Sequence, residues 1–151
     1  MTRFYGIDEA NLAIPDVERI LLDLRDQRAE LIRLRDAVLA TAGSDREEPG
    51  GNGEAPPEAV PPTERPDVGV DDRRRLRLRM QGVIDQMQAA VTQLVERDVT
   101  LREIETGLID FPALASGRQI WLCWRLGEGD IEWWHEHDDG FVGRRRLSDL
   151  T

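Results

Sequence analysis

The chain gathers its chemically reactive side chains near its C-terminus. Both histidines, the single cysteine and all four tryptophans fall within residues 118–141. His135 and His137 are separated by one residue, and alternate residues of a strand point to the same side, so this pair could chelate a divalent ion. A third ligand would have to come from an acidic side chain, the candidates being Asp110, Glu128 and Asp138. Two histidines without a fixed third partner are more often ordinary polar residues, so we expect no bound metal or other cofactor.

The remaining reactive residues do not complete a catalytic motif. Cys123 lies between Leu122 and Trp124, with no glycine-rich turn or helix N-terminus to activate its thiol, so it is predicted to be a packing residue. Pairs of carboxylates carry little information in a chain with 30 acidic residues. Arg118 and Arg144 could hold an anion, but we favour an ion pair with Asp110. These observations lean against an enzyme.

Two stretches rich in aromatic and β-branched residues, 119–126 and 131–137, must position these side chains. They are predicted to form a β-hairpin around the four-residue connection 127–130. We place Leu126 opposite Ile131. This register predicts the following cross-strand pairs: Leu122 with His135, Cys123 with Trp134, Trp124 with Trp133, and Arg125 with Glu132.

The predicted register divides the hairpin into two faces. The apolar face is expected to pack on helices, while the opposite face would be an aromatic surface suited to a partner. The predicted register also excludes Cys123 from a metal site with His135, because the two side chains would lie on opposite faces. The contact surface predicted on this basis consists of Trp121, Arg125, Trp134 and Glu136.

Two long helices are predicted to precede the hairpin, over residues 15–40 and 72–105. In both segments, apolar residues recur with an alternating spacing of three and four, which is typical of a coiled-coil seam. Pro15 suits a first helical position because its missing N–H would have no intrahelical partner there. A short helical turn is expected over residues 6–14. The fold class is therefore α+β, an antiparallel two-helix coiled-coil-like hairpin with a Trp-rich β-hairpin packed on it.

The segment between the helices has a different composition. Residues 41–70 contain six of the eight prolines and five glycines, and residues 41–72 carry nine acidic residues against two arginines. Such a segment cannot bury enough apolar surface to offset the entropy of ordering it. We predict one domain over residues 1–151, made of a first helical part at 1–40, a disordered loop at 41–71, a second helix at 72–106, and the hairpin with its tail at 107–151.

Composition excludes several classes of function. The net charge of −10 over 151 residues disfavours nucleic-acid binding, unless the basic run at residues 72–79 acts locally. No apolar run approaches the roughly 20 residues that cross a bilayer. One cysteine cannot form an internal disulfide, and the N-terminus lacks the apolar stretch of a secretory signal, so we expect a cytoplasmic protein.

Several spaced segments carry a family resemblance: residues 8–12 with Pro15, and then residues 107–112, 117–118, 122–128, 134–136 and 140–144. With these segments the chain resembles the bacterial family described as domain of unknown function 2203. The resemblance implies no established activity. It singles out Asp110, Arg118, Cys123, Trp124, Gly127, Glu128, Trp134, His135, Glu136, Gly140, Phe141 and Arg144, and it does not include His137.

These inferences lead to two hypotheses about function. The first is a non-catalytic interaction module that binds a protein partner or a second copy of itself through the outward face of the hairpin. The alternative is a binding protein or an enzyme that takes a small ligand, an anion or a metal, with a site around His135, Asp110, Glu128, Glu136 and Arg144.

Overall fold

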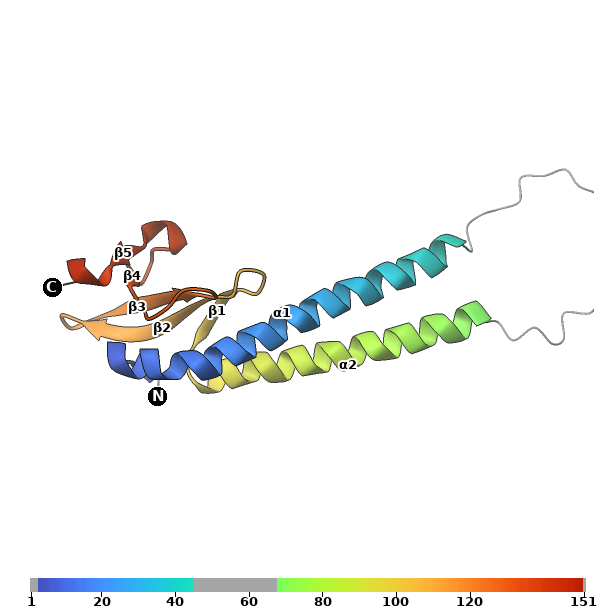
Figure 1. Cartoon of the computed structure of the whole chain (residues 1–151), viewed down its shortest axis with the longest axis horizontal. Coiled ribbons are helices and arrows are strands. Elements are labelled where there is room, and N and C mark those ends of the chain that lie inside the picture. Colours follow the sequence, from blue (N-terminus) through green and yellow to red (C-terminus); the bar gives the residue numbers. More distant parts are fainter. Residues whose placement is uncertain (1–2, 45–67, 151) are drawn as a thin grey trace, which may run out of the picture. The chain divides into compact units, whose positions relative to one another are not determined.

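The computed structural model describes residues 3–44 and 68–150, which form an α+β fold of two helices and a five-stranded antiparallel sheet (Figure 1). The described residues belong to two compact units. One comprises Met1–Arg28 with Asp85–Thr151, and the other comprises Ala29–Ile84. The first unit holds the whole sheet with the adjoining ends of both helices. It therefore contains every residue of the predicted hairpin.

Helix α1 spans Ile7–Ser44 without a break at Pro15. The sequence predicted a separate turn before Pro15, so this boundary was wrong. A proline inside a helix removes one backbone hydrogen bond and costs about 3 kcal/mol. Tertiary packing offsets this cost, because Ala10, Ile14 and Val17 on either side of the proline are buried in the core.

Helix α2 spans Val68–Glu96, which is shorter at its C-terminal end than the predicted range of 72–105. The chain leaves the helix at Asp98, whose φ of 58° is left-handed, a conformation that aspartate adopts more readily than most residues. Strand β1, Thr100–Glu103, follows directly. Leu101 and Ile104 happened to continue the helical spacing, which explains why the predicted helix extended to residue 105. Only residues 41–44 and 68–71 of the predicted loop are described, and these are helical; the rest of that prediction lies outside the described residues.

The sheet has the order β1-β2-β3-β4-β5, with all neighbouring strands antiparallel. Strand β2, Leu108–Ala115, and strand β3, Arg118–Arg125, are its longest members. They are joined by Ser116 and Gly117, both with positive φ, as in the tight turns that favour hairpins. Strand β4, Trp133–Glu136, and strand β5, Arg145–Arg146, complete the sheet. The two short 3-10 helices of the C-terminal segment are Phe141–Gly143 and Leu147–Asp149.

The register between β3 and β4 differs by one residue from the prediction. Leu122 lies opposite Trp134, and Cys123 lies opposite Trp133. The connection is longer than the four residues predicted, because neither Leu126 nor Ile131 joins the β3–β4 pairing. The Leu126 N–H donates to the Gly107 carbonyl at 3.0 Å, and the Ile131 N–H donates to Asn11 Oδ1 at 2.7 Å. Since side chains alternate along a strand, this shift turns every residue of β4 to the other face.

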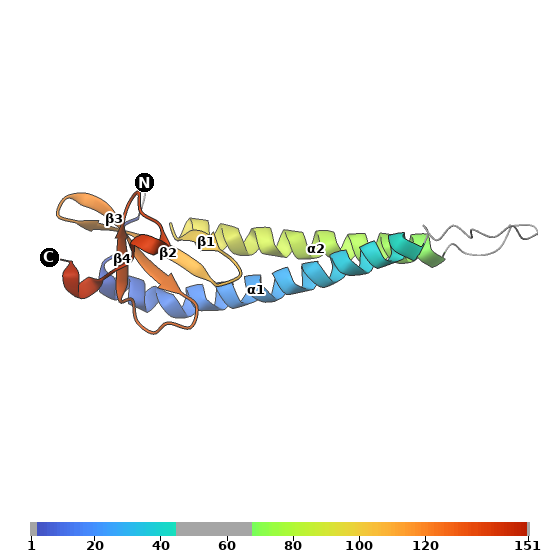
Figure 2. The ribbon, with the colours of Figure 1, turned by 90° about the horizontal axis from the view of Figure 1, so that it is seen from above.

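One face of the sheet, called the inner face below, forms the core with the helices. It contributes Ile109, Phe111, Ala113, Ile120, Leu122, Trp124 and Trp134, all buried. The start of α1 covers this face, whereas residues 137–141 line a hollow over the opposite, outer face. Strand β5 forms the edge of the sheet beside β4, on the side away from α1 (Figures 1 and 2). Tyr5 anchors the start of α1, since its ring packs edge-on against Phe111 and its N–H donates to the Pro112 carbonyl at 2.7 Å.

Gly107 allows the chain to turn closely past β3. Its φ is +68°, and a Cβ there would lie 2.6 Å from Leu126 Cβ, whereas Gly117, with φ of +77°, has open space around it. Gly117→Ala should therefore cost about 1–2 kcal/mol of backbone strain. Gly107→Ala should cost about 1–3 kcal/mol more, because it adds an overlap. Urea unfolding of both variants tests this, and equal losses would contradict the close approach.

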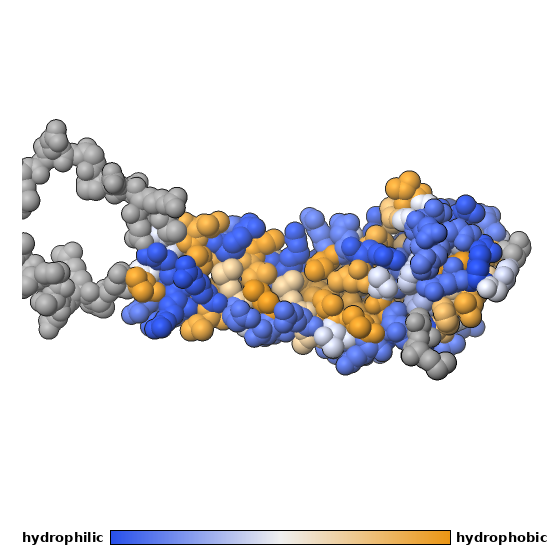
Figure 3. Space-filling view, turned by 180° about the vertical axis from the view of Figure 1, so that it is seen from behind, coloured by the Kyte–Doolittle hydropathy of each residue, from blue (hydrophilic) through white to orange (hydrophobic). Residues whose placement is uncertain are grey.

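The second unit is described at residues 29–44 and 68–84, which belong to the two helices. Leu34 is buried there, and Glu30 pairs with Arg33 and Arg79 at 2.7 and 3.1 Å. Leu39 and Leu78 stay exposed. Hydrophobic and hydrophilic side chains are intermixed along the helices (Figure 3). No helix in the described residues is long and apolar enough to span a membrane.

Candidate functional site

Three chemically reactive side chains meet on the outer face of the sheet, one from each of three adjacent strands. Asp110 on β2 lies opposite Cys123 on β3, and His135 on β4 lies diagonally across from Cys123. Each offers a possible ligand atom, and these atoms all lie within 4.8 Å of one another. The three residues are 1–2% exposed. The sequence had placed Cys123 and His135 on opposite faces, and the observed register corrects that prediction.

His135 has an acceptor at each ring nitrogen. Nε2 lies 3.0 Å from Asp110 Oδ1, and Nδ1 lies 2.9 Å from the carbonyl oxygen of Glu136. Burial opposes a charge on the ring, but the hydrogen bonds to Asp110 and Cys123, the negative charge of Asp110 and the Glu136 carbonyl outweigh it, and together they raise the pKa of His135 to about 10. His135 is therefore an imidazolium paired with the Asp110 carboxylate at neutral pH.

The second oxygen of Asp110 is held by Arg102. The Arg102 Nε donates to Asp110 Oδ2 at 2.7 Å, and its guanidinium lies over the Trp121 ring at 5.0 Å. The sequence predicted that Arg118 or Arg144 would pair with Asp110, which is wrong. Arg102 was overlooked because it was assigned to the second helix, whereas a bulge in β1 and the pairing with β2 bring it beside Asp110.

A cavity of about 280 Å³ opens above Asp110, Cys123 and His135. We call it the outer-face cavity. Its wall and rim are formed by Arg102 and Leu108 together with His137, Asp138, Asp139, Gly140 and Phe141. Arg102 is partly exposed, and its terminal amino groups have no hydrogen-bond partner among the described residues. The floor of this cavity is therefore polar and buried, and a cationic group lies at its wall.

The other predicted ligand-binding residues form ion pairs away from the cavity floor. Arg118 pairs with Glu136 at 2.6 Å, and the hydrogen bond from Arg118 lowers the pKa of Glu136. Arg144 pairs with Glu128, also at 2.6 Å, and its guanidinium lies 4.7 Å from the centre of the Phe141 ring. The alternative site predicted from the sequence is therefore divided. Asp110 and His135 meet in the cavity floor, whereas Glu128 and Arg144 pair with each other away from it.

The predicted aromatic contact surface is also divided. Trp134 lies in the core at 3% exposure, and its indole N–H donates to the Arg146 carbonyl at 3.2 Å. Trp121 is half-buried on the outer face, while Arg125 is exposed and lies over the Phe141 ring. The two indoles therefore do not form one outward surface, which corrects the sequence prediction.

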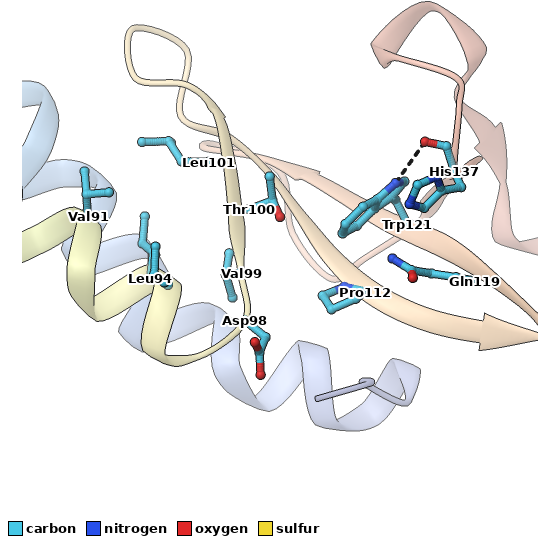
Figure 4. A pocket seen from close by; sticks show the side chains of 11 residues that line it. Val91, Leu94, Asp98, Val99, Thr100, Leu101, Pro112, Gln119, Trp121 and His137 are labelled. Carbon is cyan, nitrogen blue, oxygen red and sulfur yellow. Dashed lines mark hydrogen bonds between the residues drawn. The ribbon is translucent and has the colours of Figure 1, made fainter. Parts of the chain in front are cut away.

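Trp121 borders a second, more open pocket of about 550 Å³, shown in Figure 4. His137 stacks on Trp121 at 5.6 Å between ring centres, and its carbonyl accepts the indole N–H at 3.2 Å. His137 is thus engaged with Trp121, whereas His135 faces Asp110, so the two histidines do not share a ligand geometry. Val91, Leu94, Val99 and Leu101 supply the apolar wall of the pocket.

The fold and the cluster on its outer face define an α+β protein in which three reactive side chains from three strands lie below a small cavity. The chain matches the model of the family described as "Uncharacterized conserved protein (DUF2203)" over residues 3–147. The protein belongs to this family. Comparison with curated proteins and with solved structures finds no match to the chain.

Proposed function

We propose that this protein binds a small anionic ligand in the outer-face cavity. The observation that carries this proposal is the floor of the cavity, where Asp110, Cys123 and His135 are buried together in place of apolar side chains. Buried titratable groups gathered at the base of a concavity are typical of binding and catalytic sites. We place the protein in the cytoplasm, whose reducing conditions would keep Cys123 as a thiol.

The charges around the cavity favour an anion. Asp110 and the His135 imidazolium neutralise each other, so the guanidinium of Arg102 leaves the floor and wall with a net positive charge. Arginine presents several N–H donors in a plane that matches carboxylate and phosphate oxygens. Asp138 and Asp139 at the rim are both exposed, so solvent screens their negative charges.

An interaction module, the first function predicted from the sequence, has less support. That prediction relied on Trp121 and Trp134 projecting together from one face. Trp134 instead packs in the core, and Trp121 is partly covered by His137 and Arg102. The geometry therefore favours ligand binding over partner binding.

Alkylation of Cys123 by iodoacetamide reports access to the cavity, because the chain contains one cysteine and it lies in the cavity floor. In chelator-treated protein, we expect phosphate, sulfate or succinate to slow alkylation, as measured by intact-mass spectrometry. Arg102→Ala should weaken this protection about 10- to 100-fold, because a hydrogen bond to a charged group contributes about 1.5–3 kcal/mol.

The matched control is Arg25→Ala, which removes an exposed arginine from α1. This variant should retain full protection by the same anion, and glycerol should protect neither protein. The proposal is overturned if none of the three anions slows alkylation. It is also overturned if Arg25→Ala weakens protection as much as Arg102→Ala does.

A further inference from the structure

The three buried residues below the outer-face cavity form a set of ligands of three different types. Asp110 offers a carboxylate oxygen, Cys123 a sulfur and His135 an imidazole nitrogen, all within 4.8 Å of one another. We infer that these side chains bind a divalent transition-metal ion of the zinc class, and that the His135 Nε2 proton and the Cys123 thiol proton are released to solvent as the ion binds. This inference rests on the proposed function, because it places an ion at the floor of the same cavity.

The spacing of the ligand atoms suits this ion. Zinc bonds to sulfur, nitrogen and oxygen are about 2.0–2.3 Å long, so tetrahedral ligand atoms lie roughly 3.3–3.8 Å apart. Asp110 Oδ1 and His135 Nε2 are already 3.0 Å apart. The three residues come from paired strands, and no two of their ligand atoms are more than 4.8 Å apart, so the widest separation exceeds the tetrahedral spacing by about 1.5 Å at most.

The hydrogen-bond partners of His135 and Asp110 are of the kind that orient ligands in metal sites. A metal-binding histidine usually donates its second ring N–H to a carbonyl or carboxylate, which fixes the ring. His135 Nδ1 lies 2.9 Å from the Glu136 carbonyl oxygen, which leaves Nε2 directed at the cluster. Arg102 holds Oδ2 of Asp110 and so leaves Oδ1 on the side of His135.

The ligand types select the class of metal. A thiolate with an imidazole favours zinc and its neighbours, whereas magnesium and calcium prefer sites made of oxygen atoms. An ion pair between Asp110 and His135 accounts for those two residues, whereas a metal ion would use all three ligand atoms. Three protein ligands leave a fourth position on the ion, and the outer-face cavity lies above it. An anion bound beside Arg102 would be able to reach that position.

Cobalt(II) provides a spectroscopic test in the full-length protein. After chelator treatment, titration with cobalt(II) should produce a sulfur-to-metal charge-transfer band in the near ultraviolet and intense tetrahedral bands in the visible, saturating at one ion per chain. Zinc should displace cobalt and abolish both signals. Zinc should also slow alkylation of Cys123 in the wild-type protein, which gives a second readout that requires no variant.

Cys123→Ser should remove the charge-transfer band and weaken cobalt binding at least about 10-fold. Glu132→Gln, the matched control, should retain both, because Glu132 is exposed and lies outside both the ligand set and the cavity lining. Circular dichroism shows whether each variant is folded. If Cys123→Ser unfolds, the effect of zinc on alkylation of the wild-type thiol tests the metal site instead.

The inference is overturned if excess cobalt produces no charge-transfer band and zinc leaves the alkylation rate unchanged. Anion protection in metal-free protein is measured separately, so its persistence in that case would leave the proposed function standing. The reverse pattern, metal binding without anion protection, would support the metal site and overturn the proposal that the cavity binds an anion.

Discussion

Asp110→Ala is expected to destabilise the metal-free protein by about 3–5 kcal/mol, since removing one partner of a buried ion pair strands the other charge. Asp110 and His135 are 1% and 2% exposed and lie 3.0 Å apart. Without Asp110, His135 must either keep an unpaired charge in the interior or lose its proton. Urea unfolding followed by far-ultraviolet circular dichroism, in the presence of a chelator, measures the loss.

Two further variants show whether the loss arises from the pair. Asp130→Ala removes an exposed aspartate, and its effect should stay within about 0.5 kcal/mol. The double variant Asp110→Ala with His135→Ala should lose less stability than the sum of the two single variants, because neither charge is then stranded. Additive losses would argue against a coupled pair.

Trp134→Ala is expected to cost about 3–5 kcal/mol, the range for removing a buried aromatic side chain. The indole is 3% exposed, packs within the core cluster and donates to the Arg146 carbonyl. Trp121→Ala, on the outer face, should cost only about 1 kcal/mol because Trp121 is half-buried. Unfolding is followed by circular dichroism, since the substitutions alter the fluorescence.

This pair of variants distinguishes the observed register from the one predicted by the sequence. With Trp134 on the outer face, the two substitutions would have similar and small effects on stability. A clear excess for Trp134→Ala therefore supports its place in the core. A neutral Trp134→Ala would contradict the pairing of Trp134 with Leu122.

Some signals for the missed strands were present in the sequence. Ser116 and Gly117 form a dipeptide typical of tight turns, between two stretches that the structure shows to be β2 and β3. Pro112 argued against a strand there, because proline lacks the N–H of a central strand. It is tolerated because β1 pairs with β2 only as far as Asp110, and the next partner on that side is the Tyr5 N–H, which donates to the Pro112 carbonyl.

The candidate site was predictable only in part. The sequence singled out Asp110 and His135, but it could not assign Arg102, whose strand was hidden by a helical spacing that continued past Glu96. The sequence prediction also placed Cys123 and His135 on opposite faces of the hairpin. That placement followed from a hairpin register in which Leu126 faced Ile131, and no local signal contradicted it.

By itself, the sequence determined the α+β class, the two helices and the family, because amphipathic spacing and segment composition are local properties of the chain. The tertiary structure decided the β3–β4 register and with it the site. Asn11 holds the Ile131 N–H and Gly107 accepts from Leu126, and both contacts join residues far apart in the chain. Because side chains alternate along a strand, one residue of register sends Trp134 into the core and brings His135 beside Cys123 and Asp110.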